Sequence, residues 1–262
     1  MDLGLDGNAA LCTAASSGLG LASATALARE GADVAVCGST EAHVDEAREQ
    51  LRAAGDGDVL AVQADITNSN HVAAVVEETV EEFGGLDRVV TSAGGPPSGP
   101  FTAQADSDWY GAYDMLVMSV VWTLREARPH LVDSEAGSVV AITSRSIREV
   151  IDDLILSNAV RRAVIGIVKT VSREFAPEVR ANAVLPGAHE TGRIEELIED
   201  SVDRGEYPDY EAGYEDWASD VPLDRIGNPG ELGDVVAFLA SPRASYVNGA
   251  ALAVDGGSMR SV

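Results

Sequence analysis

The chain has 262 residues, and 45% of them are hydrophobic, which suits one domain with a substantial core. Its 43 Asp and Glu residues outnumber its 18 Lys and Arg residues, and the formal charge of −25 at pH 7 makes nucleic acid a poor partner. No apolar run approaches the length of a membrane span, and the acidic N-terminus lacks the basic segment and apolar core of a signal peptide, so we expect a cytoplasmic protein without a membrane partner.

Strands and helices are expected to alternate along the chain. Apolar runs predict strands at residues 8–13, 33–37, 59–63, 86–91, 138–142, 180–185 and 250–254. Helical patterns predict helices at residues 21–29, 41–54, 70–83, 108–131, 156–175 and 231–239. Continuous apolar strands between amphipathic helices indicate one α/β domain over residues 1–262, a doubly wound parallel sheet of Rossmann type with about seven strands and helices on both faces. Cys12 and Cys37 fall on the first two strands, where we expect buried free thiols.

The first strand runs into a loop of small residues that suits a phosphate group. Residues 11–20 read LCTAASSGLG, and the next segment is rich in Ala and Leu, which favour a helix. Gly18 and Gly20 permit a close approach of the backbone, and the start of the helix offers unpaired amides. Ala14 stands at the first small position, where such loops usually carry glycine. The loop predicts a site for the phosphates of a nucleotide.

Distinctive residues also follow the later strands, at the sheet edge where this architecture binds its ligands. They are Asp65 and Ile66 after the third strand, Ala93, Gly94 and Gly95 after the fourth, Ser144 after the fifth, Pro186 and Gly187 after the sixth, and Asp255, Gly256 and Gly257 after the last. Any one of them is common in a loop. Their order and spacing together point to a shared site.

Over essentially its whole length the sequence resembles the short-chain dehydrogenase/reductase family. The matching segments are TAASSGLG, ADIT, TSAGG, ITS, NAVLPGAHET and VDGG. The resemblance implies a nicotinamide dinucleotide held by Thr13, Ser16, Ser17, Gly18, Leu19, Gly20, Asp65, Ile66, Ala93, Gly94, Pro186, Gly187 and Thr191. It further implies a substrate lid at about residues 191–220, and a homodimer or homotetramer assembled through the helices at 108–131 and 156–175.

The residues after the second strand bear on the choice between NAD and NADP. A carboxylate there would accept both ribose hydroxyls of NAD and repel the 2′-phosphate of NADP. The segment instead carries Gly38, Ser39 and Thr40, with no acid before Glu41, and Ser39, Thr40 or His43 could donate to a phosphate. The sequence therefore leans towards NADP, although no arginine stands in the glycine loop or directly after this strand.

The catalytic pair departs from the family pattern. In the family a tyrosine passes the proton while hydride moves to or from the nicotinamide, and a lysine four residues later lowers the pKa of that tyrosine and holds the nicotinamide ribose. Alignment without gaps puts Ser157 at the tyrosine position and Arg161 at the lysine position, and no tyrosine lies between Tyr113 and Tyr207. The usual proton relay therefore cannot be carried over unchanged.

Ser144, Ser157 and Arg161 are the predicted catalytic residues. The resemblance keeps Ser144 as the catalytic serine, but the helix asparagine of the relay falls at Leu116. Arg161 is also expected to bind the cofactor through the ribose hydroxyls, although its high pKa makes it a poor proton donor near neutrality, and an unassisted serine is too weakly acidic to replace a phenol. Several donors remain open: Ser144 with an ordered water, Arg145, Arg148, His189, or one of Tyr207, Tyr210 and Tyr214.

Three functions are compatible with these residues. The first is an NAD(P)-dependent oxidoreductase that acts on an unknown carbonyl or alcohol by a non-standard proton relay, and LSNAVR in place of the Tyr-Lys motif resembles a subgroup described as 3-oxoacyl-acyl-carrier-protein-reductase-like. The second is a catalytically inactive NAD(P)-binding sensor or structural subunit. The third is a lyase or isomerase in the same pocket, which no residue specifically supports. The first is preferred because Ser144 is kept and Arg161 is again a cation; we expect a small-molecule substrate and no metal.

The excess of acidic residues suggests the environment of the protein. Strong acidity is common in disordered chains, but the apolar content and the regular hydrophobic pattern favour a folded protein. High ionic strength screens repulsion between like charges, so a salt-rich cytoplasm fits the composition better. We therefore expect a halophilic protein.

Overall fold

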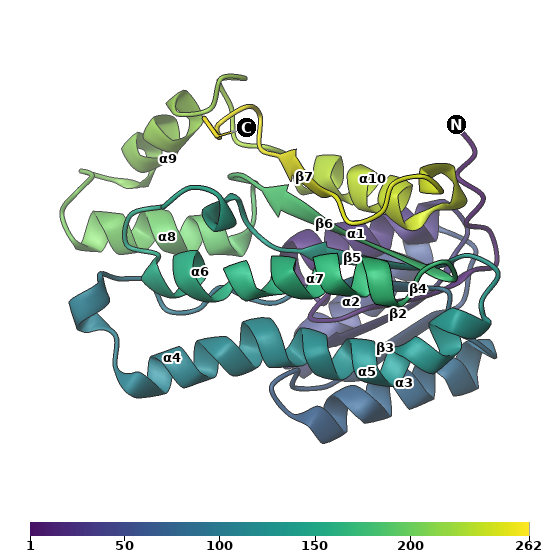
Figure 1. Cartoon of the computed structure of the whole chain (residues 1–262). Coiled ribbons are helices and arrows are strands. Elements are labelled where there is room, and N and C mark those ends of the chain that lie inside the picture. The colour runs from purple at the N-terminus through teal and green to yellow at the C-terminus, as the bar shows by residue number, and fades with distance from the viewer. Residues whose placement is uncertain (262) are drawn as a thin grey trace.

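The computed structural model describes residues 1–261, and within that range one sheet holds seven parallel strands in the order β3-β2-β1-β4-β5-β6-β7 (Figure 1). The strands are β1 (Ala9–Cys12), β2 (Asp33–Gly38), β3 (Val59–Gln63), β4 (Arg88–Thr91), β5 (Gly137–Ile142), β6 (Val179–Pro186) and β7 (Ala251–Val254). The strand order reverses between β1 and β4, which pair with each other. Ligands of such sheets bind at the carboxyl ends of the strands beside this reversal. The predicted fold class is confirmed, and the predicted domain end at residue 262 lies outside the described residues.

Helices cover both faces of the sheet and enclose two hydrophobic cores (Figure 1). One core lies under α1 (Gly18–Arg29), α2 (Glu41–Ala54) and α10 (Pro229–Ala240), and the other under α3 (Ser69–Phe83), α5 (Ser119–Asp133) and α7 (Arg162–Glu174). Alternate residues of a strand enter opposite cores: Ala10 and Cys12 lie in the first, and Leu11 lies in the second. Burial on both faces explains why the strands read as continuous apolar runs.

The segment predicted as one helix over residues 108–131 is helical throughout but contains a π-helical turn. The segment forms α4 (Asp106–Tyr113) and α5, joined by a π-helical turn at Asp114–Met118. The Ser119 hydroxyl donates to the carbonyl of Met115 at 2.6 Å, a side-chain bond that favours local bending of a helix. The apolar periodicity continues through the turn, which is why the sequence pattern does not reveal it.

The segment predicted as one helix over residues 156–175 is helical from Ile155 to Glu174 except at one residue. This segment divides at Arg161 into α6 (Ile155–Val160) and α7. The amide of Val164 donates to the carbonyl of Arg161 at 3.1 Å, a bond between residues three apart that tightens the turn. The break places the side chain of Arg161 beside the carboxyl ends of the strands.

The segment expected as a lid contains two helices that the sequence did not predict. They are α8 (Gly192–Asp203) and α9 (Tyr210–Ser219), which project beyond the carboxyl ends of the strands at the left of Figure 1. Ile194 and Ile198 lie on one stripe of α8 and form a small core with Ile226. The lid is therefore a folded helical pair with its own apolar contacts.

Both cysteines are buried free thiols, as expected. Burial raises the pKa of Cys12 and raises the pKa of Cys37 to about 11, so both stay protonated and behave as small apolar side chains. None of the helices within residues 1–261 combines the length and the apolar character needed to cross a bilayer.

Arg180 of β6 links the sheet to the end of α10. Its guanidinium donates to the carbonyls of Leu239 at 3.0 Å and Ser241 at 2.9 Å, and also to that of Val247 at 3.2 Å. The last carbonyls of a helix have no partner within the helix and carry its partial negative charge. Arg180 therefore satisfies these acceptors and stabilises the packing of α10.

We expect Arg180→Met to lower the free energy of unfolding by about 2 kcal/mol, because several partly buried carbonyls lose a charged donor. At this chain length that loss corresponds to a fall of roughly 4–8 °C in the melting temperature, measured by circular dichroism. Arg173→Met is the control, since Arg173 is exposed on α7 and its side chain bonds to none of residues 1–261. Equal melting temperatures for the two variants would contradict this role of Arg180.

Candidate active site

A cavity of about 520 Å³ lies at the carboxyl ends of the central strands. The loops after β1, β4, β5 and β6 contribute to it, together with the start of α8 and Trp217 of α9. Among the predicted site residues, those that line it are Ser17, Gly18, Leu19, Gly20, Ala93, Gly94, Ser144, Ser157, Arg161, Pro186, Gly187 and Thr191. The predicted cofactor loops and the predicted catalytic residues therefore meet in one space.

The loop after β1 is shaped for close approach of a ligand to the backbone. Ala14 adopts a left-handed conformation with φ 46°, which explains why glycine is usual there. A Cβ on Gly20 would lie 2.8 Å from the carbonyl oxygen of Ala14, so no side chain fits at that position. Ser17 precedes α1 and its side chain makes no capping bond, which leaves the first amides of the helix available to an anion.

The end of β2 has no room for the carboxylate that would favour NAD. A Cβ on Gly38 would overlap the side chain of Ser16. Ser39 and Thr40 follow with exposed side chains. The steric contact excludes an acid at residue 38 unless Ser16 moves.

The other predicted cofactor residues do not line the cavity. They are Thr13, Ser16, Ser39, Thr40, Asp65 and Ile66. Thr13 is buried, and its amide donates to the carbonyl of Val90 at 3.0 Å, which holds the ends of β1 and β4 together. Hydrogen bonds from the amide and hydroxyl of Thr67 lower the pKa of Asp65, which stays charged at the end of β3. Ile66 is buried beside it.

Three serines and one arginine form a connected group at the inner end of the cavity. Arg161 donates through Nε to Ser157 Oγ at 3.1 Å and through Nη2 to the carbonyl of Gly94 at 2.9 Å. Ser157 Oγ lies 3.1 Å from Ser146 Oγ, and the amide of Ser146 donates to Ser144 Oγ at 3.1 Å. Burial, and secondly the positive charge of Arg193, lower the pKa of Arg161 to about 10. These contacts fix Ser144, Ser157 and Arg161 relative to one another.

The geometry narrows the choice of proton donor among the lid tyrosines. The hydroxyl of Tyr207 donates to Asp216 at 2.7 Å, which raises the pKa of this tyrosine to about 12. The hydroxyl of Tyr214 donates to Glu190 at 2.7 Å, and that bond raises its pKa. Tyr210 is exposed. Tyr210 and Tyr214 do not line the cavity, and Tyr207 lines a second cavity that adjoins it. Tyr207 and Tyr214 hold the lid together through their hydroxyls.

His189 and Arg148 are also engaged in structural contacts. His189 is buried, and Nδ1 lies 3.2 Å from the carbonyl of Gly187, which assigns the proton to Nδ1. Burial lowers the pKa of His189 and favours its neutral form. Arg148 is exposed and donates to the carbonyl of Ala251 at 3.0 Å.

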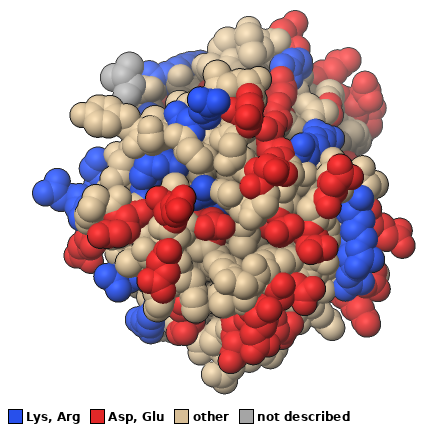
Figure 2. Space-filling view, turned by 90° about the vertical axis from the view of Figure 1, so that its right-hand side faces the viewer, with Lys and Arg blue, Asp and Glu red and all other residues tan. Residues whose placement is uncertain are grey.

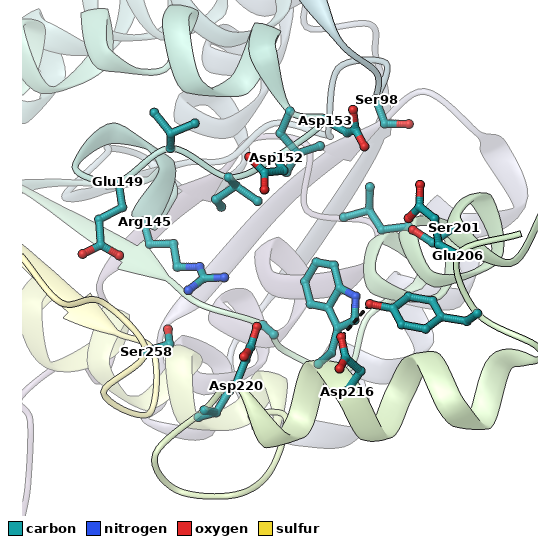
Figure 3. A pocket seen from close by; sticks show the side chains of 18 of the residues that line it. Ser98, Arg145, Glu149, Asp152, Asp153, Ser201, Glu206, Asp216, Asp220 and Ser258 are labelled. Carbon is teal, nitrogen blue, oxygen red and sulfur yellow. Dashed lines mark hydrogen bonds between the residues drawn. The ribbon is translucent and has the colours of Figure 1, made fainter. Parts of the chain in front are cut away.

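A second cavity of about 360 Å³ adjoins the first (Figure 3). The residues shared by the two are Arg145, Ile151, Leu154, Ala188, Leu197 and Trp217. Its other walls come from the loop before α6 and from the two lid helices. The arrangement suits a cofactor in the first cavity and a substrate that enters through the second.

The sequence did not predict two residues that shape the site. Ser146 is completely buried and bridges Ser144 to Ser157, although only its position two residues after Ser144 could have drawn attention to it. Arg193, in the first turn of α8, folds over Gly95 and donates to the carbonyl of Pro96 at 2.8 Å. Arg193 thereby fastens the lid to the loop after β4.

Comparisons with known proteins identify the family of this chain. A family model described as enoyl-(acyl carrier protein) reductase matches residues 13–259. Short-chain dehydrogenase/reductase SDRA from Arabidopsis thaliana is 31% identical over 254 residues, which cover 97% of this chain and 95% of that protein. The 3-oxoacyl-(acyl-carrier-protein) reductase FabG from Staphylococcus aureus is 30% identical over 253 residues, which cover 95% of this chain and 96% of that protein.

A solved structure is similar over the full length of both chains. L-sorbose reductase from Gluconobacter frateurii, in complex with NADPH and L-sorbose, superposes with a TM-score of 0.94 at 29% identity and covers 100% of each chain. The matched region includes every loop that lines the two cavities. The chain therefore belongs to the short-chain dehydrogenase/reductase family and is an oxidoreductase of that family.

Proposed function

We propose that the protein is an NADP(H)-dependent reductase of a small carbonyl compound in which Ser144, Ser157 and Arg161 replace the usual catalytic arrangement. The observation that carries this proposal is the contact of Arg161 with both Ser157 and Gly94, at 3.1 and 2.9 Å, inside the cavity formed by the cofactor loops. A cation and two hydroxyls at this place provide donors for a carbonyl oxygen and for ribose hydroxyls.

The cofactor fits the residues present. Gly18 adopts a left-handed conformation and Gly20 packs against the backbone of Ala14, so two residues without side chains shape the loop, and the amides at the start of α1 suit a pyrophosphate. The remaining proposed contacts are Thr13, Ser16, Ser17, Ser39, Thr40, Asp65, Ile66, Ala93, Gly94, Arg161, Pro186, Gly187 and Thr191. When bound, the nicotinamide supplies the hydride for the reduction. The L-sorbose reductase structure contains NADPH, which supports binding of NAD(P) here.

The contact between Ser16 and Gly38 favours NADP over NAD in this proposal. It leaves no space for a carboxylate at residue 38, and the exposed hydroxyls of Ser39 and Thr40 are free to donate to a 2′-phosphate. NADP can bind without a strong cation at this place, because the carboxylate that would repel its 2′-phosphate is missing. The preference for NADP is therefore modest.

Ser144 is suited to bind the carbonyl oxygen of the substrate. Its Oγ already accepts a hydrogen bond from the amide of Ser146, so its hydroxyl hydrogen remains available to donate. Arg161 uses Nε and Nη2 for Ser157 and Gly94 and retains Nη1, which bonds to none of residues 1–261. Two donors are thus available where negative charge develops on the oxygen.

Arg161 can complete the reaction in the direction of reduction. Addition of hydride to the carbonyl carbon gives an alkoxide, a much stronger base than neutral guanidine, so a guanidinium can donate a proton to it directly or through Ser157. The reverse reaction requires neutral guanidine as the base, and a pKa of about 10 leaves very little of that form near neutrality. The site therefore acts as a reductase at neutral pH.

The wider setting of the protein is proposed on separate grounds. Acidic side chains are spread over the face shown in Figure 2 and exceed the basic ones there, which supports a halophilic protein in a salt-rich cytoplasm.

Tyr110 and Tyr113 expose 73% and 48% of their surface on α4, and such aromatic residues suit a contact between subunits. We propose a homotetramer on this basis, with light scattering as its direct test.

We expect Arg161→Met to lower kcat/KM for carbonyl reduction by about 100-fold, while Arg161→Lys keeps part of the activity. In the unchanged protein, reduction should be constant near neutrality and fall as the pH rises through about 10, where Arg161 loses its proton, and alcohol oxidation should rise over the same range. In Arg161→Lys the fall should occur at lower pH, because burial lowers the pKa of a lysine from about 10.4.

Arg162→Met is the matched control for Arg161, because Arg162 is exposed and donates only to the carbonyl of Asn158. An identical pH profile for Arg161→Lys and the unchanged protein would rule out Arg161 as the titrating group. Binding of NADPH without turnover of any carbonyl would instead favour a dinucleotide-binding sensor.

We expect Ser39→Asp to weaken NADPH binding by about tenfold or more, because the carboxylate repels the 2′-phosphate, and to leave NADH binding nearly unchanged. Isothermal titration in molar potassium chloride measures both affinities. Ser39→Asn is the control, since it has nearly the same shape without the charge. Equal losses for both cofactors in Ser39→Asp would contradict the proposed position of the phosphate.

We expect the melting temperature to rise steeply as potassium chloride is added and to level off near molar concentration. Screening is almost complete there, because the Debye length falls from about 10 Å at 0.1 M to about 3 Å at 1 M. A melting temperature that does not depend on salt would contradict halophilic adaptation.

A further inference from the structure

The second cavity contains more acidic than basic side chains (Figure 3). The acidic residues are Glu149, Asp152, Asp153, Glu206, Asp216 and Asp220, and the basic residues are Arg145 and Arg204. An excess of acids is expected anywhere on a chain of this composition. The side chains that matter for ligand binding are therefore those that have no partner within the protein.

Most of the charges have a partner. Arg204 pairs with Glu206 at 2.7 Å and lies 3.8 Å from Asp153. Asp216 accepts the hydroxyl of Tyr207. Glu149 accepts the backbone amide of Arg260 at 2.6 Å. These groups hold the walls of the cavity together.

Three charges remain for a ligand. Arg145 is half-buried, and Asp152 and Asp220 are exposed. Their side chains form no ion pair or hydrogen bond with any of residues 1–261. In Figure 3 the guanidinium of Arg145 and the carboxylate of Asp220 are turned towards the middle of the cavity. The cavity thus offers one strong donor and two strong acceptors, beside the apolar surfaces of Leu154 and Trp217.

Molecules with several hydroxyl groups match donors and acceptors together without carrying any charge. An anion could pair with Arg145 but would face Asp152 and Asp220, and an organic cation could pair with those acids but would face Arg145. An apolar ketone would gain no polar contact from any of the three charges. A hydroxyl group both donates and accepts, so a molecule with several hydroxyls satisfies Arg145, Asp152 and Asp220 at once.

We infer that the substrate is a small, uncharged, polyhydroxylated carbonyl compound, and that Arg145, Asp152 and Asp220 bind its hydroxyl groups. The cavity volume of 360 Å³ would hold about a dozen heavy atoms at roughly 30 Å³ each. Arg145 lines both cavities and directly follows Ser144, so a molecule bound to it extends towards the site of reduction. The carbonyl part of this inference rests on the proposed function; the polyol part rests on the cavity alone.

Measurements of equilibrium binding test the polyol part of the inference separately from the carbonyl part. Isothermal titration of the full chain, loaded with NADP⁺ in molar potassium chloride, compares four probes: sorbitol, sorbitol 6-phosphate, 1-amino-1-deoxysorbitol and 1,6-hexanediol. We expect sorbitol to bind at least about tenfold more tightly than each of the others, because each of them loses or opposes one class of contact. NADPH oxidation with fructose, fructose 6-phosphate, 2-hexanone and acetoacetyl-coenzyme A provides the matching rates.

Variants test the assigned residues. The double substitution Asp152→Asn and Asp220→Asn should weaken sorbitol binding about tenfold and raise KM for fructose with little change in kcat. Glu215→Gln is the matched control, because Glu215 is an exposed acid of α9 that does not line the cavity, and it should leave both values unchanged. Circular dichroism verifies that both variants are folded.

Each result has a distinct meaning. Sorbitol binding without fructose reduction would support the polyol site and overturn the proposed reductase. Tighter binding of the phosphate, the amine or the diol would overturn the polyol site, as would a preference for acetoacetyl-coenzyme A in turnover. Absence of sorbitol binding, or equal binding by the double variant and the unchanged protein, would also overturn it.

Discussion

Burial of the Arg161 guanidinium constrains the whole catalytic end of the protein. A charged group removed from water costs several kcal/mol unless hydrogen bonds replace its hydration. Arg161 obtains these bonds from Ser157 and from the carbonyl of Gly94, so it ties the break between α6 and α7 to the loop after β4. Ser157 in turn is held against Ser146, which orients Ser144. The position of each proposed catalytic group therefore depends on satisfying one buried cation.

In the proposed mechanism, the same cation also bears on the direction of the reaction. Burial and the charge of Arg193 lower the pKa of Arg161 only to about 10, which keeps it protonated near neutrality. A phenol with a similar pKa is neutral when protonated, whereas the guanidinium is positive and also stabilises the developing alkoxide electrostatically. In the proposed mechanism, exchange of a phenol for a guanidinium thus strengthens oxyanion stabilisation, while either group with a pKa of about 10 leaves little base for alcohol oxidation near neutrality.

The sequence predicted the sheet and the loops at its carboxyl edge well because both depend on local patterns. Continuous apolar strands identified all seven strands of the described chain, and the glycine loop indicated α1, which begins at Gly18, three residues before the predicted start. The substitution at Ala14 proved compatible with the loop because an alanine can adopt φ 46° at a modest energetic cost. Ser157 and Arg161 came together as expected, since residues four apart share one face of a helix.

The missed features depend on contacts between distant segments. The π-helical turn at Asp114–Met118 and the break at Arg161 leave the apolar stripe intact, so periodicity cannot detect them. The helices of the lid carry many acids, and their small core around Ile198 is completed by Ile226 from beyond the lid. Arg193 gains its position from the carbonyl of Pro96, almost a hundred residues earlier in the chain. Such contacts become visible only when the chain is folded.

High salt changes how the acids of the second cavity can act. At molar ionic strength the Debye length is about 3 Å, so the net charge of the chain hardly influences an approaching ligand. Selection then rests on direct contacts, which salt screens much less in a partly enclosed site. Asp153 and Glu206 have such contacts with Arg204, whereas Asp152 and Asp220 have none within the described chain. Asp152 and Asp220 are also exposed, so their position sets them apart from the other surface acids: they line one cavity with Arg145, whose side chain has no partner within the described chain, and a ligand that donates and accepts can bind all three.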